Sequence, residues 1–169
     1  MKIILLIIVA LNLFGNNLDI AKDLFDNKEK YKEAIEIFEK YKDDGESQYY
    51  LGKAYYYGFG VQKNEKKAFE LAKKSASKNN ASGLNLLGVL YQYGQGTNKD
   101  EAKAFEYYIQ AANLNNIKAM FNLARIYSGI DLNGKEVSFS IKKDYEKALY
   151  WLKEAYDLGS VEAAYYYGN

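Results

Sequence analysis

The sequence predicts an all-α protein built from repeated pairs of antiparallel helices, and three observations support this. The chain of 169 residues contains no proline, the residue that most often interrupts a helix. Lysine, alanine, leucine and glutamate, which are good helix formers, are abundant. The chain also resembles itself at an offset of 36 residues, and a fixed period of this length is typical of stacked helical units.

The repeat is clearest when residues 47–80 are aligned with residues 83–116, where fifteen of 34 positions are identical. A third copy follows at Leu123, Ala124 and Tyr127 and continues, after eight extra residues, at Ala148 and Ala155. The apolar and small residues recur at helical spacing within each copy, which predicts two packed helices per unit. Identical pairs include Leu51/Leu87, Gly52/Gly88, Tyr55/Tyr91, Ala68/Ala104 and Phe69/Phe105.

The units follow one another along the chain. Residues 18–45 form a degenerate opening repeat, in which Ala21, Leu24 and Phe25 precede a second helical stretch. Terminal units commonly depart from the pattern of their neighbours. Three full repeats and the start of a truncated fourth are then expected at 46–80, 81–116, 117–160 (with an insertion at 130–143) and 161–169.

Turn and cap residues mark the ends of the expected helices. Gly58 and Gly94 are expected to end the first helix of two units, because glycine readily adopts the left-handed cap conformation. Asn64, Asp100 and Asp144 are expected to begin the second helices, because their short polar side chains satisfy free backbone N–H groups. Each unit is therefore a helix, a turn and a capped second helix.

Two glycines, Gly52 and Gly88, lie in the middle of the expected first helices. Glycine at such a position costs about 1 kcal/mol relative to alanine. We interpret both as positions where the backbone of a neighbouring helix approaches closely. Small residues at these positions predict tight packing between helices.

The composition excludes several classes of function. Twenty-three basic and 22 acidic residues nearly cancel, so neither nucleic acid nor an acidic membrane surface is expected as a partner. The absence of histidine and cysteine excludes the usual zinc, haem and iron–sulfur ligands, every disulfide, and histidine-based or cysteine-based catalysis. We expect no metal site, no cofactor and no catalytic residue.

Residues 1–15 predict a secretory signal peptide. Lys2 supplies a positive start, and residues 3–14 are almost wholly apolar. This stretch is too short to cross a bilayer but suits the core of a signal. Gly15 fits the cleavage rule and Leu13 does not, so an uncleaved anchor and a buried first helix stay open. The signal predicts a periplasmic or secreted protein that contacts a membrane only through this segment.

The recurring motif resembles a known repeat. The pattern Leu-Gly-x-x-Tyr-x-x-Gly-x-Gly, followed by Asp/Asn-x-x-Lys-Ala and Ala-Ala, is similar to the Sel1-like repeat, a relative of the tetratricopeptide repeat. Residues 46–80 and 81–116 match closely, whereas residues 117–160 lack the Gly-x-Gly turn. The resemblance implies a right-handed α-solenoid of antiparallel helix pairs with a role in protein–protein binding or scaffolding.

The resemblance also implies where a partner binds, because the first helix of each tetratricopeptide pair lines a concave groove. Tyrosine offers a large rigid contact area with a hydrogen-bonding tip, and a cation among aromatics can hold a peptide carboxylate. The alternative is that several of these tyrosines only pack the solenoid. The groove positions are Tyr49, Lys53, Tyr56, Tyr57, Asn85, Val89, Gln92, Tyr93, Lys118, Phe121 and Arg125, flanked by Glu46, Ser82, Ser128, Gly129 and Tyr165.

We therefore expect an exported adaptor that binds an extended peptide or a cell-envelope protein. The rival is a β-lactamase or penicillin-binding hydrolase, a label common in a cysteine-rich secreted branch of the family. Ser75 and Ser140 begin the Ser-x-x-Lys spacing of such enzymes, but the other motifs and all cysteines are missing. Self-association through an uncovered C-terminal end is a further expectation.

Overall fold

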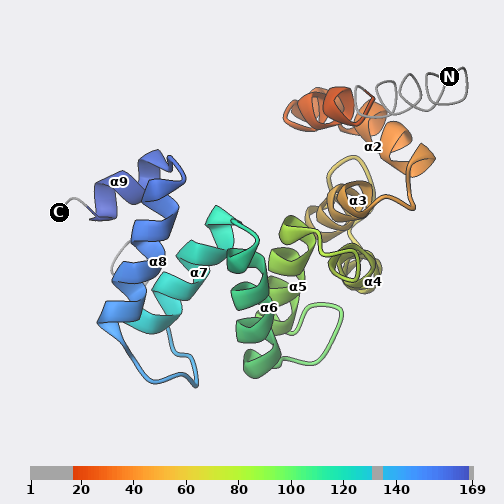
Figure 1. Ribbon diagram of the computed structural model, residues 1–169. Helices are drawn as coiled ribbons and strands as arrows, with labels where there is room; N and C mark the ends of the chain where they lie inside the picture. Colours follow the sequence, from red (N-terminus) through yellow and green to blue (C-terminus); the bar gives the residue numbers. More distant parts are fainter. Residues whose placement is uncertain (1–16, 131–134, 168–169) are drawn as a thin grey trace, which may run out of the picture.

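The computed structural model describes residues 17–130 and 135–167, most of which lie in helices (Figure 1). Within these residues, β-structure is limited to one isolated bridge between Ile130 and Glu136, so the expected all-α fold is confirmed. After a helix at residues 17–25, the elements are η1 (Lys28–Lys30), α2 (Tyr31–Lys40), α3 (Gly45–Tyr57), α4 (Glu65–Ala76), α5 (Ala81–Tyr93), α6 (Glu101–Asn113), α7 (Ile117–Ser128), α8 (Tyr145–Asp157) and α9 (Val161–Tyr167).

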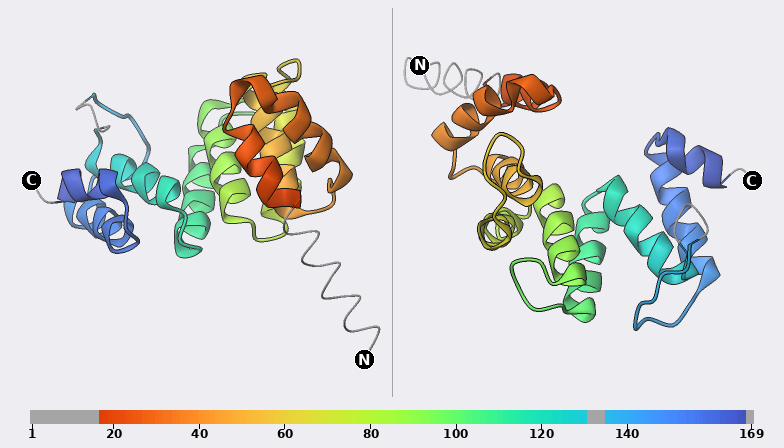
Figure 2. Two further views of the ribbon diagram at one scale, coloured as in Figure 1. Left: turned by 90° about the horizontal axis from the view of Figure 1, so that it is seen from above. Right: turned by 180° about the vertical axis from the view of Figure 1, so that it is seen from behind.

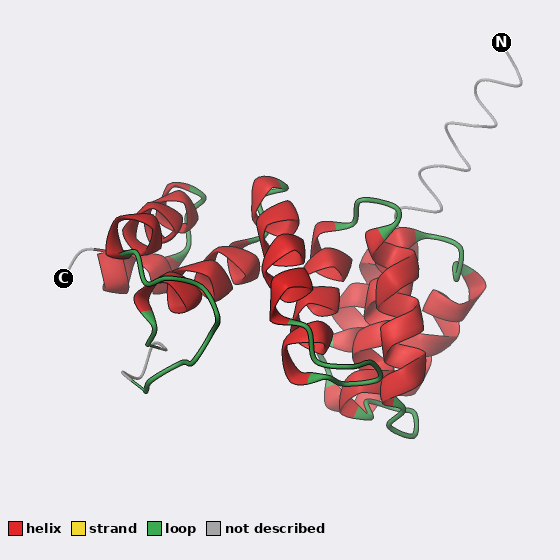
Figure 3. Ribbon diagram, turned by 90° about the horizontal axis from the view of Figure 1, so that it is seen from below, coloured by secondary structure: helices red, strands yellow, loops and turns green. Residues whose placement is uncertain are grey.

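The helices form antiparallel hairpins that follow one another along a curved path (Figures 1 and 2). α3 packs on α4, α5 on α6 and α7 on α8, while α4 with α5 and α6 with α7 join successive hairpins. Figure 3 shows the same arrangement from below, with loops only between the helices. This is the expected solenoid of helix pairs. The predicted signal peptide at 1–15 lies outside the described residues.

Short polar side chains begin the helices, as expected. Asn64, Asp100 and Asp144 each accept a hydrogen bond from the backbone N–H three residues later, at 3.0 Å in every case. Asn80 and Asn116 do the same for α5 and α7, at 2.8 and 2.9 Å. Each of these contacts satisfies one backbone donor that the first turn of a helix leaves free.

The Gly-x-Gly turns end a helix and also join two hairpins. Gly94 adopts a left-handed φ of 67° at the end of α5, which glycine does without steric cost. The second glycine of the turn, Gly96, lies directly against α4, since a Cβ there would be 2.2 Å from the Glu65 carbonyl oxygen. Gly60 packs in the same way, with its Cβ position 2.9 Å from the Cβ of Tyr31.

The mid-helix glycines lie close to a neighbouring helix, as expected. A Cβ on Gly88 would lie 2.7 Å from the ring of Tyr108 and 3.1 Å from the Ala104 carbonyl oxygen, so this glycine makes room for a side chain as well as for the backbone of α6. A Cβ on Gly52 would lie 3.3 Å from the tip of Leu86 and 3.4 Å from the Ala68 carbonyl oxygen, which is a looser contact.

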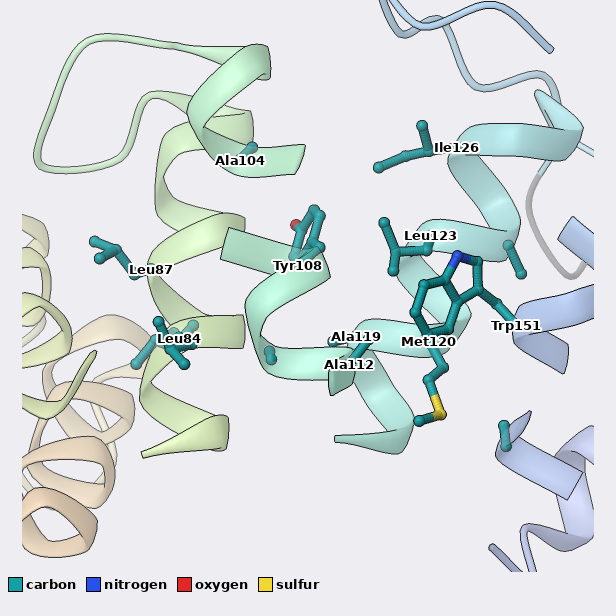
Figure 4. Packing of buried hydrophobic residues seen from close by; sticks show 14 of the residues in the cluster. Leu84, Leu87, Ala104, Tyr108, Ala112, Ala119, Met120, Leu123, Ile126 and Trp151 are labelled. Atoms are coloured by element: carbon teal, nitrogen blue, oxygen red, sulfur yellow. The ribbon is translucent and has the colours of Figure 1, made fainter. Parts of the chain in front are cut away.

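The buried core runs along the hairpins and is divided into two clusters. The larger one includes Leu84 and Leu87 of α5, Tyr108 of α6 and Leu123 of α7, so it extends across successive hairpins (Figure 4). The smaller cluster centres on Phe25, which is 2% exposed and packs in the opening unit with α2 and α3. Residues 17–40 are therefore part of the solenoid.

The insertion at 130–143 leaves the end of α7 and returns to the solenoid. The backbone N–H of Val137 donates to the Gly129 carbonyl at 2.8 Å. Ser140 donates from its backbone N–H and its hydroxyl to Glu101 of α6, at 2.9 and 2.7 Å. Phe139 packs against the larger core cluster. The described part of the insertion is therefore tied to the second and third repeats.

Candidate functional site

Side chains of α3, α5 and α7 form a surface that we call the α3–α5–α7 face. It is defined by the eleven residues that the sequence predicts for a groove: Tyr49, Lys53, Tyr56, Tyr57, Asn85, Val89, Gln92, Tyr93, Lys118, Phe121 and Arg125. Hydrogen bonds between the helices bring part of this set together. Asn122 of α7 donates to Asn85 Oδ1 of α5 at 3.0 Å, and Arg125 Nη2 donates to Gln92 Oε1 at 3.1 Å.

The aromatic side chains of this face are of two kinds. Tyr57 and Tyr93, which are 36 residues apart, are both 56% exposed and available for contact. Tyr49, Tyr56 and Phe121 are half-buried and pack against the larger core cluster. The packing interpretation therefore applies to Tyr49, Tyr56 and Phe121, whereas a role of the exposed tyrosines in binding stays a prediction. The freely exposed aromatic surface is smaller than the sequence suggests.

Lys53 lies where the opening unit meets the face. Its ammonium group is 5.1 Å from the ring centre of Phe25 and 5.9 Å from that of Tyr50. Burial lowers the pKa of Lys53, and the positive charge of Lys118 on α7 lowers it further. The groove pattern gives no signal for Phe25, because this residue belongs to the opening unit. Two cations and an aromatic platform thus meet at this end of the face.

Two half-buried tyrosines of α3 keep their protons further into the alkaline range than a free tyrosine does. Burial raises the pKa of Tyr49 to about 12, and the neighbouring Tyr50 adds to the effect. Burial also raises the pKa of Tyr56.

A buried polar network connects α6, α5 and α7. The hydroxyl of Tyr108, a fully buried residue, donates to Gln92 Oε1 at 2.7 Å, and the same oxygen accepts from Arg125. Gln92 is 7% exposed, so it lies beneath the face and positions Arg125. The sequence did not indicate Tyr108, because the equivalent position of the preceding repeat holds Ala72. The available signal was a tyrosine at a position that holds Ala72 in the preceding repeat and Leu152 in the following one.

A cavity of about 270 Å³ lies between this network and the insertion. Three residues of the face, two residues at or just before the start of α6 and residues 135–139 of the insertion line it. Its walls are formed by Gln92, Tyr93, Lys99, Glu101, Arg125, Lys135, Glu136, Val137, Ser138 and Phe139. The groove pattern contains no equivalent of this wall, because the insertion has no counterpart in the other repeats.

Sequence comparison assigns the repeats to a family. A sequence model of the Sel1 repeat matches residues 45–80, 81–116 and 117–160, which together are more than half of the chain. The chain belongs to the Sel1 repeat family. A search of functionally curated proteins finds no match to this Sel1 repeat chain.

Three solved structures share the fold of this Sel1 repeat chain. A Sel1 repeat protein from Oxalobacter formigenes superposes with a TM-score of 0.72 at 26% identity, covering 90% of this chain and 58% of that protein. The protein c5321, a protective antigen of uropathogenic Escherichia coli with an SLR fold, gives 0.63 at 23% identity, covering 89% and 32%. Cysteine rich protein B of Helicobacter pylori gives 0.55 at 25% identity, covering 87% and 96%. The chain thus spans little more than half of the first protein and a third of the second.

The two serines of the Ser-x-x-Lys motifs have structural partners in this Sel1 repeat chain. Ser75 is fully buried, and its hydroxyl donates to the Gly45 carbonyl at 2.6 Å, which joins α4 to α3. A Cβ on Gly83 would lie 2.1 Å from the same hydroxyl, so three helices meet there. The hydroxyl of Ser140 is bonded to Glu101. Ser75 is therefore a packing residue and is not accessible to a substrate.

In the part of the chain that the structure describes, no group of three or more aspartate, glutamate, histidine or cysteine side chains could hold a metal ion. No helix in residues 17–130 or 135–167 is both long and apolar enough to cross a membrane.

Proposed function

We propose that this Sel1 repeat chain is an adaptor that binds an extended segment of a partner protein along the α3–α5–α7 face. The Sel1 repeat is generally a protein–protein interaction module, and the chain has that helical fold. The face offers exposed aromatic rings, cations and amide side chains next to one another, which suits the side chains and backbone of a peptide.

The observation that carries the proposal is a contrast between positions related by the repeat. The leucine positions of the core keep their residue type, as Leu51, Leu87 and Leu123 do. Several positions on the face change theirs, because Tyr49 is equivalent to Asn85 and Phe121, whereas Tyr57 and Tyr93 keep theirs. The face therefore combines a repeated exposed tyrosine with side chains that change from one repeat to the next, and such a surface can distinguish one extended segment from another.

The test is a crosslinked pull-down from an extract of the source cells with two matched triple variants. The first carries Tyr57→Ala, Tyr93→Ala and Lys118→Gln, three exposed positions of the face. The second carries Tyr145→Ala, Tyr150→Ala and Lys142→Gln, three exposed positions on or beside α8. Tyr49 and Phe121 are left unchanged because they pack against the core.

We expect the first variant to lose the partners that the native chain recovers and the second to keep them. Circular dichroism and thermal unfolding establish that both variants are folded. Equal recovery of the same partners by both variants would show that the α3–α5–α7 face is not the binding surface.

We also propose that the protein is exported, on the basis of the apolar segment at residues 1–15. The measurement is the N-terminal sequence and mass of the protein isolated from each cell fraction. Export predicts a shortened chain in the periplasm or the medium. A full-length chain confined to the cytosol would contradict it.

Self-association through the C-terminal end stays a prediction. Val161 of α9 is 86% exposed and Leu149 of α8 is 51% exposed, so apolar surface lies near this end of the described residues. Light scattering of the purified chain, with Val161→Asp as the matched variant, tests it. The prediction requires a dimer or larger species that the variant reduces to a monomer.

A further inference from the structure

The insertion adds a wall to one end of the α3–α5–α7 face and so forms a half-open cavity there. The cavity of about 270 Å³ has Gln92 and Arg125 on the solenoid side and residues 135–139 on the other. Ser140 ties the insertion to Glu101 through two hydrogen bonds, and Phe139 anchors it in the core. This volume is smaller than a drug-sized pocket, which begins at about 300 Å³, and suits the end of a peptide or one side chain.

Arg125 is the only arginine in the sequence, and it is incompletely satisfied. Among the described residues, its one hydrogen bond joins Nη2 to Gln92 Oε1, a neutral acceptor. Its Nε is buried and has no hydrogen-bond partner. No carboxylate of residues 17–130 or 135–167 forms an ion pair with it within 4.0 Å. A guanidinium presents five N–H donors in a fork that matches a carboxylate.

The acidic groups in the cavity wall are already engaged elsewhere. Glu101 is 2.7 Å from the ammonium group of Lys99 and accepts both hydrogen bonds of Ser140. These contacts hold the pKa of Glu101 below its usual value, with Lys99 the larger cause. Glu136 lies 3.8 Å from Lys143. The cation at the base of the cavity therefore has no internal counter-ion among these groups.

We propose that this cavity binds a carboxylate of the bound segment, with Arg125 as the group that contacts it. Gln92 and Tyr108 orient the guanidinium from below, and the insertion excludes water from one side. This inference rests on the proposed function, because the carboxylate belongs to the same partner segment that binds along the α3–α5–α7 face. A carboxylate in the cavity also gives the guanidinium a charged acceptor in place of the neutral amide of Gln92 alone, and charge-assisted hydrogen bonds are the stronger kind.

The experiment uses nuclear magnetic resonance, because a single arginine gives a single Nε–H signal. Three probes are titrated into the full chain: acetyl-trialanine with a free carboxylate, the same peptide as its C-terminal amide, and acetyl-Ala-Glu-Ala amide. We expect the free acid to shift the Arg125 signal in a saturable way and the amide of trialanine to leave it unchanged. A shift with acetyl-Ala-Glu-Ala amide alone assigns the site to an acidic side chain instead of a chain terminus.

Variants separate a specific site from a general effect of charge. Arg125→Gln should weaken binding of the charged probe, measured by calorimetric titration, about tenfold or more, as expected for loss of a charge-assisted hydrogen bond. Lys74→Gln removes an exposed cation of α4 that lies outside the face and the cavity wall, and it should leave binding of this probe unchanged. Equal shifts with the free acid and its amide, no shift with either charged probe, or equal weakening by both variants would each overturn the proposal.

Failure of the carboxylate site can be distinguished from failure of the proposed binding face, because the probe titration and the pull-down test them separately. If the probes bind as expected but the pull-down variants of the face keep their partners, the carboxylate site stands and the extended binding face does not. If the face variants lose their partners but no charged probe shifts Arg125, the face stands and this proposal fails.

Discussion

The junction between the first and second repeats differs from the junction between the second and third. At the first, α4 presents Ala72, and α3 and α5 pack directly on each other. At the second, α6 presents Tyr108 at the equivalent position, and α5 and α7 approach each other far less. Figure 4 shows the ring of Tyr108 between α5 and α7. Gly88 on α5 leaves the space that this ring occupies.

The difference shows how one repeat carries two kinds of packing. At the first junction the small side chain of Ala72 on α4 accompanies direct packing of α3 on α5, and no buried tyrosine hydroxyl of the described residues lies there. At the second junction, α5 and α7 are less closely packed, and the buried hydroxyl of Tyr108 donates to Gln92, which in turn positions Arg125. Polar positioning therefore arises where the repeat departs from its own pattern. Four substitution experiments sharpen this comparison, from the largest expected effect to the smallest.

Tyr108→Ala should have the largest effect on stability. It removes a fully buried ring from between α5 and α7 and leaves Gln92 without one of its donors. Truncation of a buried aromatic residue costs about 3–5 kcal/mol of unfolding free energy. Urea unfolding measures it, and a loss below about 1 kcal/mol would mean that the second junction does not depend on this ring.

Gly88→Ala and Gly52→Ala form a matched pair at equivalent positions of the two junctions. The added methyl group at Gly88 overlaps the Tyr108 ring at 2.7 Å and should cost about 1–3 kcal/mol. At Gly52 the nearest atom is 3.3 Å away, and alanine gains about 1 kcal/mol in helix propensity, so little net change is expected. Equal unfolding free energies for the two variants would contradict the contrast between the junctions.

Tyr49 makes stability depend on pH in the alkaline range. Its pKa is raised by burial to about 12 in the folded chain, against about 10 when unfolded. The folded state thus holds this proton more tightly, so the stabilisation is complete below pH 10 and is lost as the pH rises toward 12. Tyr49→Phe should lose less stability than the native chain over this interval in parallel urea titrations. Identical pH profiles would contradict the assigned environment of Tyr49.

Tyr57→Ala and Tyr93→Ala should have the smallest effects on stability, within about 0.5 kcal/mol, because both side chains are 56% exposed. Their effects on binding should differ. Tyr93 lines the cavity at the second junction and Tyr57 does not, so only Tyr93→Ala should weaken the free-carboxylate probe. Calorimetric titration of both variants measures the affinity for the probe. Equal weakening by Tyr57→Ala and Tyr93→Ala would show that the probe does not bind in the cavity.

The period of the sequence was sufficient to predict the helix pairs and the caps at Asn64, Asp100 and Asp144, because these depend on residues close together in the chain. The resemblance to a known repeat supplied the positions of the face. It could not predict the hydrogen bonds of Tyr108 with Gln92, because Tyr108 departs from the shared repeat pattern and that pattern describes only the residues that the repeats have in common. The path of the insertion was also beyond sequence reasoning, because it depends on long-range contacts such as Ser140 with Glu101.

The most direct test of the central claim places a photocrosslinking phenylalanine analogue at Tyr57, at Tyr93 or at Tyr145, three exposed tyrosines in one folded chain. Each variant is illuminated with the partner recovered in the pull-down. The account predicts crosslinks from Tyr57 and Tyr93 to one continuous segment of the partner and none from Tyr145. Crosslinking from Tyr145 with none from Tyr57 or Tyr93 would contradict binding along the α3–α5–α7 face.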